Sequence, residues 1–507
     1  MADSLLLGAL GCAALAYALE FLLQPRPAGA WRRPGGCHLV HWGLCWLAFA
    51  GLALLLQRPY FALAVVGAFL FLVVMVNNAK FHSLREPFIC QDFEYFTDAL
   101  KHPRLYIPFL GWGRALAAAL AAVAAIWAGF ALETPLTADI GWPALLRQGG
   151  MLALAGVSLL ALGTRICPPA EHVPLADLSR LGLLASLWRY HLDEAASPQI
   201  PDTPLPTLPP VTADSPDLVV VQSESFFDAR RSYPGLRRDL LPEFDRLRRE
   251  SAAWGQLEVP AWGANTVRSE FSVLSGLAAE RLGVHRFNPY RRLAKCGVAT
   301  LASCLRDAGY RTVCVHPYPA TFYERHRVYP LLGFDRFIDI SAFGNAERYG
   351  PYVSDGAVAA MVGDLLAEQR ATSAQPLFVF VITMENHGPL HLEKVAPGDS
   401  ERLYEQVPPA GCDDLTIYAR HLVNADRMFG RLREMLLESP RPGTLCVYGD
   451  HVPIMPGVYS TMGIPDGTTD YFVWSKRLAG SQEAPPPRSA AMSANELAPM
   501  LLGLLSS

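Results

Sequence analysis

The chain has 507 residues, a formal net charge of −4 and a hydrophobic fraction of 51 %. This length exceeds that of one typical domain, and the acidic balance gives no indication of nucleic acid as a partner. Residues 1–165 are mostly apolar with sparse charge, whereas residues 217–507 read as an ordinary globular α/β sequence. The composition therefore indicates a membrane part followed by a soluble part.

The first 165 residues contain apolar segments close to the roughly 20 residues that a helix needs to cross a bilayer. The first of these segments lacks a basic start and a clear cleavage site, so we expect a span rather than a signal peptide. A transmembrane domain over residues 1–165 is predicted, with five spans near Leu5–Leu23, Leu39–Leu56, Phe61–Val76, Ala115–Leu132 and Trp142–Gly163.

Basic residues beside the predicted spans bear on the orientation. Three follow the first span and four lie between the third and fourth: Arg26, Arg32, Arg33, Lys80, Arg85, Lys101 and Arg104. The positive-inside rule places both loops in the cytoplasm, and five spans then leave the C-terminal part in the cytoplasm too. An external C-terminal part would require a span count that differs by one, or a loop from Phe81 to Arg104 that lies at the interface and escapes the rule.

Residues 166–216 are predicted to join the two parts. Glu171–Ala195 has apolar residues at helical spacing, which indicates a helix along the membrane surface or a cap on the next domain. Residues 197–216 are rich in proline and lack periodicity, which is typical of a semi-rigid spacer. The soluble domain is expected over residues 217–507.

Short apolar runs alternate with helical patterns in this soluble domain. Strands are predicted at Asp217–Ser223, Arg311–His316, Leu377–Thr383, Thr444–Tyr448 and Tyr471–Trp474. Helices are predicted at Leu240–Glu250, Thr266–Leu277, Val298–Ala308, Gly356–Gln369, Leu415–Leu437 and Ala494–Leu505. This alternation predicts an α/β fold with a mainly parallel sheet between two helical layers.

Polar residues follow four of the five predicted strands. In an open parallel sheet, ligands bind beyond the carboxyl ends of the strands. A shared site is therefore expected there, formed by Glu224, His316, His387, Asp450 and His451.

Thr266 lies in a turn of small residues that opens a predicted helix. A threonine hydroxyl becomes a nucleophile when a divalent metal stabilises its deprotonated form, and a helix N-terminus favours a phosphate. Glu224, Asp450 and His451, with the Thr266 hydroxyl, supply a ligand set that suits Mn²⁺, Mg²⁺ or Zn²⁺.

Each of these residues also has a simpler interpretation when taken alone. Thr266 could be a helix N-cap, with Ser269 or Glu270 as its capping-box partner. His387 could be a structural histidine, and Asp450 with His451 an ordinary turn. It is the combined placement at strand ends that favours a site of phosphoryl or sulfuryl transfer.

The ten cysteines are scattered, and no CxxC pair is present. This spacing argues against a zinc site made of thiolates. One or two disulfides beyond the membrane part, or buried unpaired thiols, both fit the sequence.

Several segments resemble the lipoteichoic acid synthase family, with its phosphoglycerol transferases, in the sulfatase and alkaline phosphatase superfamily. They are Ser223–Ser225, Thr266, Thr321–Arg325, Met384–His387 and Tyr448–His451. The resemblance implies that Glu224, Thr266, Asp450 and His451 bind one divalent metal, with Mn²⁺ favoured. It also implies that Thr266 and His387 are catalytic and that Tyr323, Arg325 and His387 bind the substrate. No C/S-x-P-x-R segment lies near Thr266, which argues against a formylglycine sulfatase.

The activity implied by the resemblance is transfer of a phosphoglycerol headgroup from phosphatidylglycerol to a glycan or polymer acceptor, through a phospho-threonine intermediate. The implied location is the inner membrane of a bacterial cell, with several spans and an external or periplasmic catalytic domain. Tyr323 stands where well-known members have tryptophan, and Glu324 where an amide is usual. Phosphoethanolamine transfer and hydrolysis of phosphate or sulfate esters are therefore alternatives, as is a non-catalytic membrane scaffold.

Overall fold

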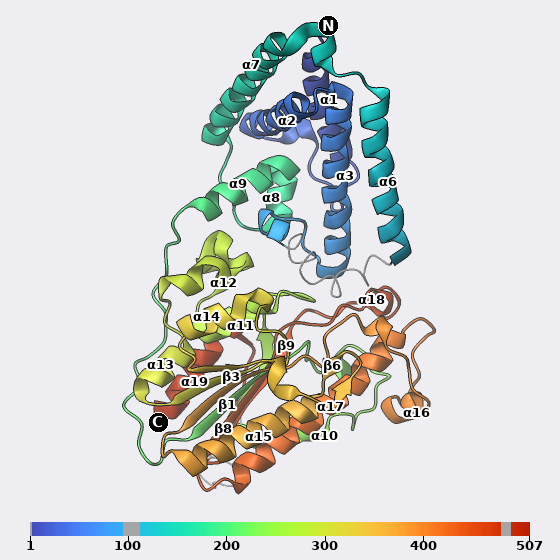
Figure 1. The fold of residues 1–507 in the computed structure, drawn as a ribbon. Helices are drawn as coiled ribbons and strands as arrows, with labels where there is room; N and C mark the ends of the chain where they lie inside the picture. Colours follow the sequence, from blue (N-terminus) through green and yellow to red (C-terminus); the bar gives the residue numbers. More distant parts are fainter. Residues whose placement is uncertain (1–2, 95–111, 478–487, 507) are drawn as a thin grey trace. The chain divides into compact units, whose positions relative to one another are not determined.

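The computed structural model describes residues 3–94, 112–477 and 488–506 (Figure 1). It forms two compact units, Met1–Ser197 and Pro198–Ser507. The boundary lies within the segment predicted to join a membrane part to a soluble part.

The first unit contains a helix at the position of each predicted span. Three of these helices are long and apolar enough to cross a membrane, as judged on the described residues: α2 (Gly35–Leu56), α3 (Pro59–Leu84) and α7 (Leu136–Ile166). The other two, α1 (Asp3–Glu20) and α6 (Trp112–Leu132), contain shorter apolar stretches. A count of five spans remains a prediction.

Helices α2 and α7 pack with their backbones in close contact through glycines. A Cβ atom at Gly43 would lie 2.7 Å from the backbone nitrogen of Leu160, and one at Gly163 would lie 2.7 Å from that of Val40. In a bilayer, where apolar burial does not drive association, such close backbone contact is a main source of helix–helix affinity.

Two basic residues used in the orientation argument are engaged in ion pairs inside the first unit. Arg33 lies 2.7 Å from Glu20, and each side chain is 5 % exposed. Lys80 lies 2.6 Å from the buried Asp92. Part of the basic excess in these two loops is therefore compensated internally.

The Glu20 carboxylate also accepts a hydrogen bond from the backbone of Leu183, at 2.8 Å. This contact joins the end of α1 to α9 (Leu183–Ala195), which follows α8 (Pro174–Leu181). The helical segment expected over residues 171–195 is therefore two short helices that pack on the membrane helices.

The second unit has one large sheet, with strand order β10-β2-β9-β8-β1-β7-β3-β4 among the described residues. From β8 to β4 neighbouring strands are parallel, while β9 is antiparallel to both β8 and β2. The strands on this path are β1 (Asp217–Ser223), β2 (Ala253–Glu258), β3 (Arg311–Val315), β4 (Arg336–Ile338), β7 (Leu377–Ile382), β8 (Gly443–Gly449), β9 (Thr469–Ser475) and β10 (Arg488–Ser489), with β11 (Met492–Ser493) also paired to β2.

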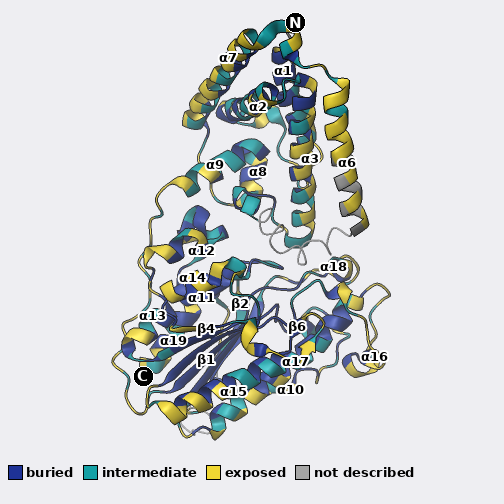
Figure 2. Cartoon of the chain, viewed as in Figure 1, coloured by how far each residue is buried: buried dark blue, intermediate teal, exposed yellow. Residues whose placement is uncertain are grey.

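Helices cover both faces of this sheet, and its strands are buried between them (Figures 1 and 2). The side chains of β1 alternate between the two cores: Val219 and Val221 face one, and Leu218 and Val220 face the other. The first core includes α10 (Pro242–Glu250), α15 (Asp355–Thr372) and α17 (Asp413–Glu438). The second includes α11 (Thr266–Ser275), α13 (Leu301–Ala308), α14 (Arg325–Leu331) and α19 (Leu497–Ser506). The predicted α/β fold class is confirmed.

The proline-rich linker is partly bound to the second unit rather than free along its whole length. Pro204 and Leu205 lie against Gly276, and the backbone of Val211 donates a hydrogen bond of 2.8 Å to the carbonyl of Ala308. Leu208 also packs on the adjacent core. The free spacer is therefore shorter than residues 197–216.

All ten cysteines are free thiols in the structure. The two with their sulfur atoms in contact, Cys37 and Cys167 at 3.4 Å, belong to the first unit. Of the two alternatives that the sequence allows for the second unit, the structure has unpaired thiols.

The glycine contact between α2 and α7 can be tested with a matched pair of variants. Gly43→Leu is expected to lower the stability of the detergent-solubilised protein by roughly 1–3 kcal/mol, because the side chain meets a backbone that cannot move aside. Gly51→Leu on the same helix is the control, since no described atom lies within 4 Å of its Cβ position. Thermal unfolding of both variants measures the difference, and equal melting temperatures would contradict the proposed contact.

Candidate metal centre

The sheet brings the predicted metal ligands to one edge. Strands β1 and β8 are parallel neighbours, and their last residues, Ser223 and Gly449, are paired in register. The next residues along the chain, Glu224 and Asp450, therefore leave the sheet side by side. β7, the other neighbour of β1, ends shortly before His387.

Glu224, Asp450 and His451 form a buried cluster whose ligand atoms all lie within 4.8 Å of one another. His451 Nε2 lies 3.3 Å from Asp450 Oδ2 and 3.6 Å from Glu224 Oε1. On the other side of the ring, Nδ1 lies 3.1 Å from the carbonyl of Val452, which fits the tautomer that donates from Nδ1. This leaves the Nε2 lone pair directed at the carboxylates, as a metal ligand requires.

The electrostatics of the cluster fit a bound cation. Burial, together with the adjacent Asp450 carboxylate, raises the pKa of Glu224 to about 8. No residue that the structure describes donates a hydrogen bond to Asp450 Oδ2. Two buried carboxylates with an unused oxygen are unfavourable unless a positive charge compensates them, so these residues suit a divalent metal.

Ser225 holds the two carboxylates in place. Its backbone is left-handed, with φ of 53°, which turns its N–H to Asp450 Oδ1 at 2.9 Å. Its hydroxyl donates to Glu224 Oε1 at 2.9 Å. The sequence analysis gave Ser225 no role, because a left-handed serine has no sequence signature.

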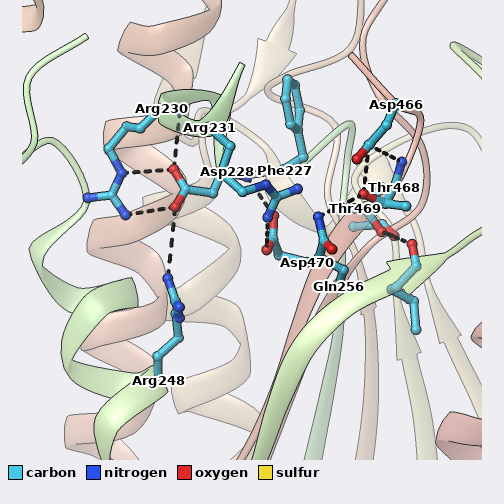
Figure 3. A network of polar contacts seen from close by, with 12 residues as sticks. Phe227, Asp228, Arg230, Arg231, Arg248, Gln256, Asp466, Thr468, Thr469 and Asp470 are labelled. Atoms are coloured by element: carbon cyan, nitrogen blue, oxygen red, sulfur yellow. Dashed lines mark hydrogen bonds and ion pairs between the residues drawn. The ribbon is translucent and has the colours of Figure 1, made fainter. Parts of the chain in front are cut away.

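A second network fixes the loops behind the cluster (Figure 3). Asp470 on β9 accepts a hydrogen bond of 2.7 Å from the backbone of Asp228 and pairs with Arg231. The neighbouring Thr469 donates to the carbonyl of Gly449 at 2.8 Å. Gly449 must remain glycine, because a Cβ atom there would lie 1.8 Å from the carbonyl oxygen of Phe226.

Thr266 is the first residue of α11 and is partly exposed. The N-cap position belongs to Asn265, whose φ is 66°, so the alternative in which Thr266 is the cap is wrong. Neither predicted capping-box partner has that role. Ser269 donates to the carbonyl of Asp450 at 2.6 Å, and Glu270 pairs with Arg325. The Ser269 bond joins the start of this helix to the metal cluster.

His387 lies within electrostatic reach of the cluster. Burial lowers the pKa of His387, while the carbonyl of Gly388 and the charge of Asp450 oppose that shift. Nδ1 contacts the Gly388 carbonyl at 2.7 Å, which fits donation from Nδ1 and leaves Nε2 as the acceptor. The imidazole is thus neutral and able to accept a proton.

Of the two residues before His387, Glu385 is held by polar contacts and Asn386 has an unpaired side chain. Glu385 accepts a hydrogen bond of 2.7 Å from the backbone of Asp355 and lies 3.3 Å from His421. Asn386 is 3 % exposed, and neither of its side-chain polar atoms bonds to a described residue. A buried amide without a partner is a group that a bound substrate could satisfy. The sequence analysis did not single out Asn386.

The segment predicted to bind the headgroup has an unusual backbone. Tyr323 and Glu324 both have positive φ, at 53° and 52°. Arg325 follows them but turns inward: it is 1 % exposed and lies 2.9 Å from Glu270. The guanidinium packs over the ring of Tyr323, at 5.2 Å from its centroid. Tyr323 is only partly buried, so its ring can be reached by a substrate. Arg325 could contact a substrate directly only if its buried ion pair with Glu270 opened.

Comparisons with known proteins agree with this architecture. A family model described as Sulfatase matches residues 216–507. The capsular polysaccharide biosynthesis protein RkpI of Rhizobium meliloti is 29 % identical, over 95 % of this chain and 90 % of that protein.

Two solved structures extend the comparison. The integral membrane protein lipooligosaccharide phosphoethanolamine transferase A of Neisseria meningitidis aligns over 100 % of this chain and 95 % of its own, with a TM-score of 0.56 and 13 % identity. The phosphoglycerol transferase GacH of Streptococcus pyogenes, in complex with sn-glycerol-1-phosphate, aligns over 59 % of this chain and 76 % of its own, with a TM-score of 0.46 and 22 % identity.

The cluster can be tested as a metal site without an activity assay. Adding MnCl₂ to metal-stripped protein is expected to raise its melting temperature, since binding at 100 times Kd stabilises the folded state by about 2.7 kcal/mol. Glu224→Gln and Asp450→Asn should lose most of this shift. The exposed Asp466 provides the control, because Asp466→Asn should keep the full shift. A wild-type shift in both cluster variants would place the metal elsewhere.

Proposed function

The chain belongs to the sulfatase family, and on that basis we propose that it is a membrane-anchored, metal-dependent transferase. It moves a phosphoglycerol headgroup from phosphatidylglycerol to a glycan or polymer acceptor, through a phospho-threonine intermediate. One observation carries the proposal: the buried Glu224, Asp450 and His451 cluster is joined through Ser269 to the helix that begins at Thr266.

Transfer would proceed in two displacements at phosphorus. The Thr266 hydroxyl attacks the phosphodiester of the lipid, the bond from phosphorus to the diacylglycerol oxygen breaks, and diacylglycerol leaves. An acceptor hydroxyl then attacks the same phosphorus, and the bond to the Thr266 oxygen breaks. Each displacement needs a base for the attacking hydroxyl and an acid for the leaving oxygen, and the neutral His387 can accept and return that proton.

The other site residues position and stabilise the phosphoryl group. Glu224, Asp450 and His451, with Thr266, would hold one divalent cation, which stabilises negative charge on the threonine oxygen and on the phosphoryl group. Mn²⁺ is favoured for this oxygen-rich set, with Mg²⁺ and Zn²⁺ as alternatives. The N–H groups that begin α11 favour the anionic group at Thr266. Tyr323 and the unpaired amide of Asn386 are the candidates for contacts with the headgroup.

A glycan acceptor is supported by the similarity to RkpI, whose name records a role in capsular polysaccharide biosynthesis. The membrane helices would keep the site near a lipid donor, which raises the effective concentration of that donor. We propose that the catalytic unit works on the external side of a bacterial inner membrane, where envelope glycans are modified.

A second candidate is transfer of phosphoethanolamine. It is favoured by Glu324, an exposed carboxylate in the segment proposed to meet the headgroup, because a carboxylate can pair with the ammonium that phosphoglycerol lacks. The alignment with a phosphoethanolamine transferase over the whole chain supports the shared architecture.

The nucleophile and the headgroup can be identified in one experiment. Purified protein is incubated with phosphatidylglycerol or phosphatidylethanolamine, and the Thr266 peptide is analysed by mass spectrometry. We expect a phosphoglycerol adduct from the first lipid, and loss of both adduct and turnover in Thr266→Ala, by about 10³-fold or more for removal of a nucleophile. Thr372→Ala, at the exposed end of α15, should behave as wild type.

Other outcomes of this experiment have defined meanings. An adduct formed only from phosphatidylethanolamine favours the second candidate, and free headgroup released without an acceptor indicates a hydrolase. Full activity in Thr266→Ala would exclude the proposed nucleophile.

The side of the membrane can be determined by a reporter fused after Ser507. A periplasmic reporter such as an alkaline phosphatase fusion should be active, and a fluorescent protein that folds only in the cytoplasm should stay dark. The reverse pattern would exclude an exported polymer as the product. Fusions at Gln57, in the loop after α2, should report the opposite side if all five helices cross.

A further inference from the structure

A fully buried ion pair joins α11, the helix that begins at Thr266, to the start of α14. Glu270 is 0 % exposed and Arg325 is 1 % exposed, and Arg325 Nη2 lies 2.9 Å from Glu270 Oε2. Glu270 is one helical turn after Thr266 on α11. Burying two charges carries a large desolvation penalty, so a pair retained in this position needs an explanation beyond stability.

Every carboxylate oxygen of Glu270 has a partner. Tyr290 and Tyr329 both donate their hydroxyl groups to Oε1. Gln222 donates to Oε2 at 3.4 Å and accepts a hydrogen bond of 2.5 Å from the hydroxyl of Tyr448. The carboxylate is thus fixed in one orientation from several directions.

Arg325 is held equally firmly. Its Nη1 lies 3.3 Å from His316 Nε2, while His316 Nδ1 lies 3.3 Å from the carbonyl of Ile382. Burial, together with the charge of Arg325, lowers the pKa of His316 well below its ordinary value. The imidazole is therefore neutral and accepts from Arg325. His316, predicted from the sequence to lie at the site, contacts Arg325 of this pair.

The network touches the three segments that carry Glu224, Thr266 and Asp450. Gln222 lies on β1 just before Glu224, Tyr448 lies on β8 just before Asp450, and Glu270 follows Thr266 on α11. These three segments are far apart in the sequence. The ion pair and its hydrogen bonds are a direct polar link among them beneath the metal cluster.

We propose that Glu270 and Arg325 are a positioning pair that sets the location of Thr266 relative to the metal ligands and balances the charge beneath them. The proposal rests on the proposed function in so far as Thr266 is the nucleophile. It assigns Arg325 a role inside the protein, in place of the substrate contact that the resemblance implied.

The charges of the pair should affect cation binding at the cluster, which a residue with only a packing role would not do. The positive charge of Arg325 is compensated by the Glu270 carboxylate, at 2.9 Å. Glu270→Gln would leave that positive charge uncompensated, which opposes a cation at the cluster. Arg325→Gln would remove it and leave an extra negative charge, which favours a cation. The double variant restores neutrality.

The test is a double-mutant cycle on the full-length protein, with Mn²⁺ affinity measured by titration calorimetry. Glu270→Gln should weaken Mn²⁺ binding by about tenfold, Arg325→Gln should not weaken it, and the double variant should return to within about threefold of wild type, the non-additivity expected for a coupled pair. Glu250→Gln is the control, because it removes the carboxylate from a partly exposed pair with Arg433, at 2.7 Å.

Turnover supplies a second readout. Glu270→Gln should lower kcat by about 10–100-fold with little change in KM for the lipid, because displacement of a nucleophile impairs the chemical step more than binding. If Glu270→Gln does not fold, Tyr290→Phe removes one hydrogen bond to Glu270 without changing charge. This variant should lower kcat by a smaller factor than Glu270→Gln and leave the Mn²⁺ affinity unchanged.

The outcomes separate this proposal from the proposed function. Wild-type Mn²⁺ affinity and turnover in Glu270→Gln, or losses that simply add in the double variant, would overturn the positioning pair. A wild-type protein that transfers no headgroup from either lipid would overturn the proposed function, while the affinity cycle would still decide whether the pair controls the metal site.

Discussion

The site depends on one unfavourable arrangement, the burial of Glu224 and Asp450 side by side. Two carboxylates in a low-dielectric environment repel each other and lose their hydration, so the protein must compensate both effects. Ser225 supplies two hydrogen bonds, and His451 directs its Nε2 at both carboxylates. What remains uncompensated is negative charge directed at one point, which is the property that selects a cation.

The topology of the sheet brings Glu224 and Asp450 together. β1 lies between β7 and β8, and all three are parallel, so the segments after them meet at one edge without long loops. Thr266, the proposed nucleophile, is positioned differently, since α11 packs on the sheet face and is tied to Asp450 through Ser269. The location of Thr266 therefore depends on helix packing, and the Glu270 and Arg325 pair lies in that contact.

The sequence predicts the centre of this fold better than its margins. β1 and its neighbours are continuous apolar runs, which are recognisable because both faces of these strands are buried. β2 was missed because its side chains alternate between buried and more exposed positions, and β4 because it has three residues. The cluster of Glu224, Asp450 and His451 was predictable because these residues follow strands directly.

The supporting residues were not predictable in the same way. Ser225 depends on a left-handed backbone, and the partner of Glu270 lies 55 residues away in the sequence. No local pattern encodes either feature. The linker illustrates the same limit: its proline content predicted stiffness, but not that Pro204 and Leu205 would pack on the end of α11.

That packed linker leaves only a short free connection between the two units. Only residues 196–203 connect the end of α9 to the first contact at Pro204. A fully extended chain spans at most about 3.5 Å per residue, so this connecting segment spans at most roughly 30 Å. This length is close to the thickness of the hydrocarbon core of a bilayer, about 30 Å. Under the proposed function, the catalytic unit would act on lipid headgroups near its own membrane helices, and the acceptor would have to come to the membrane surface.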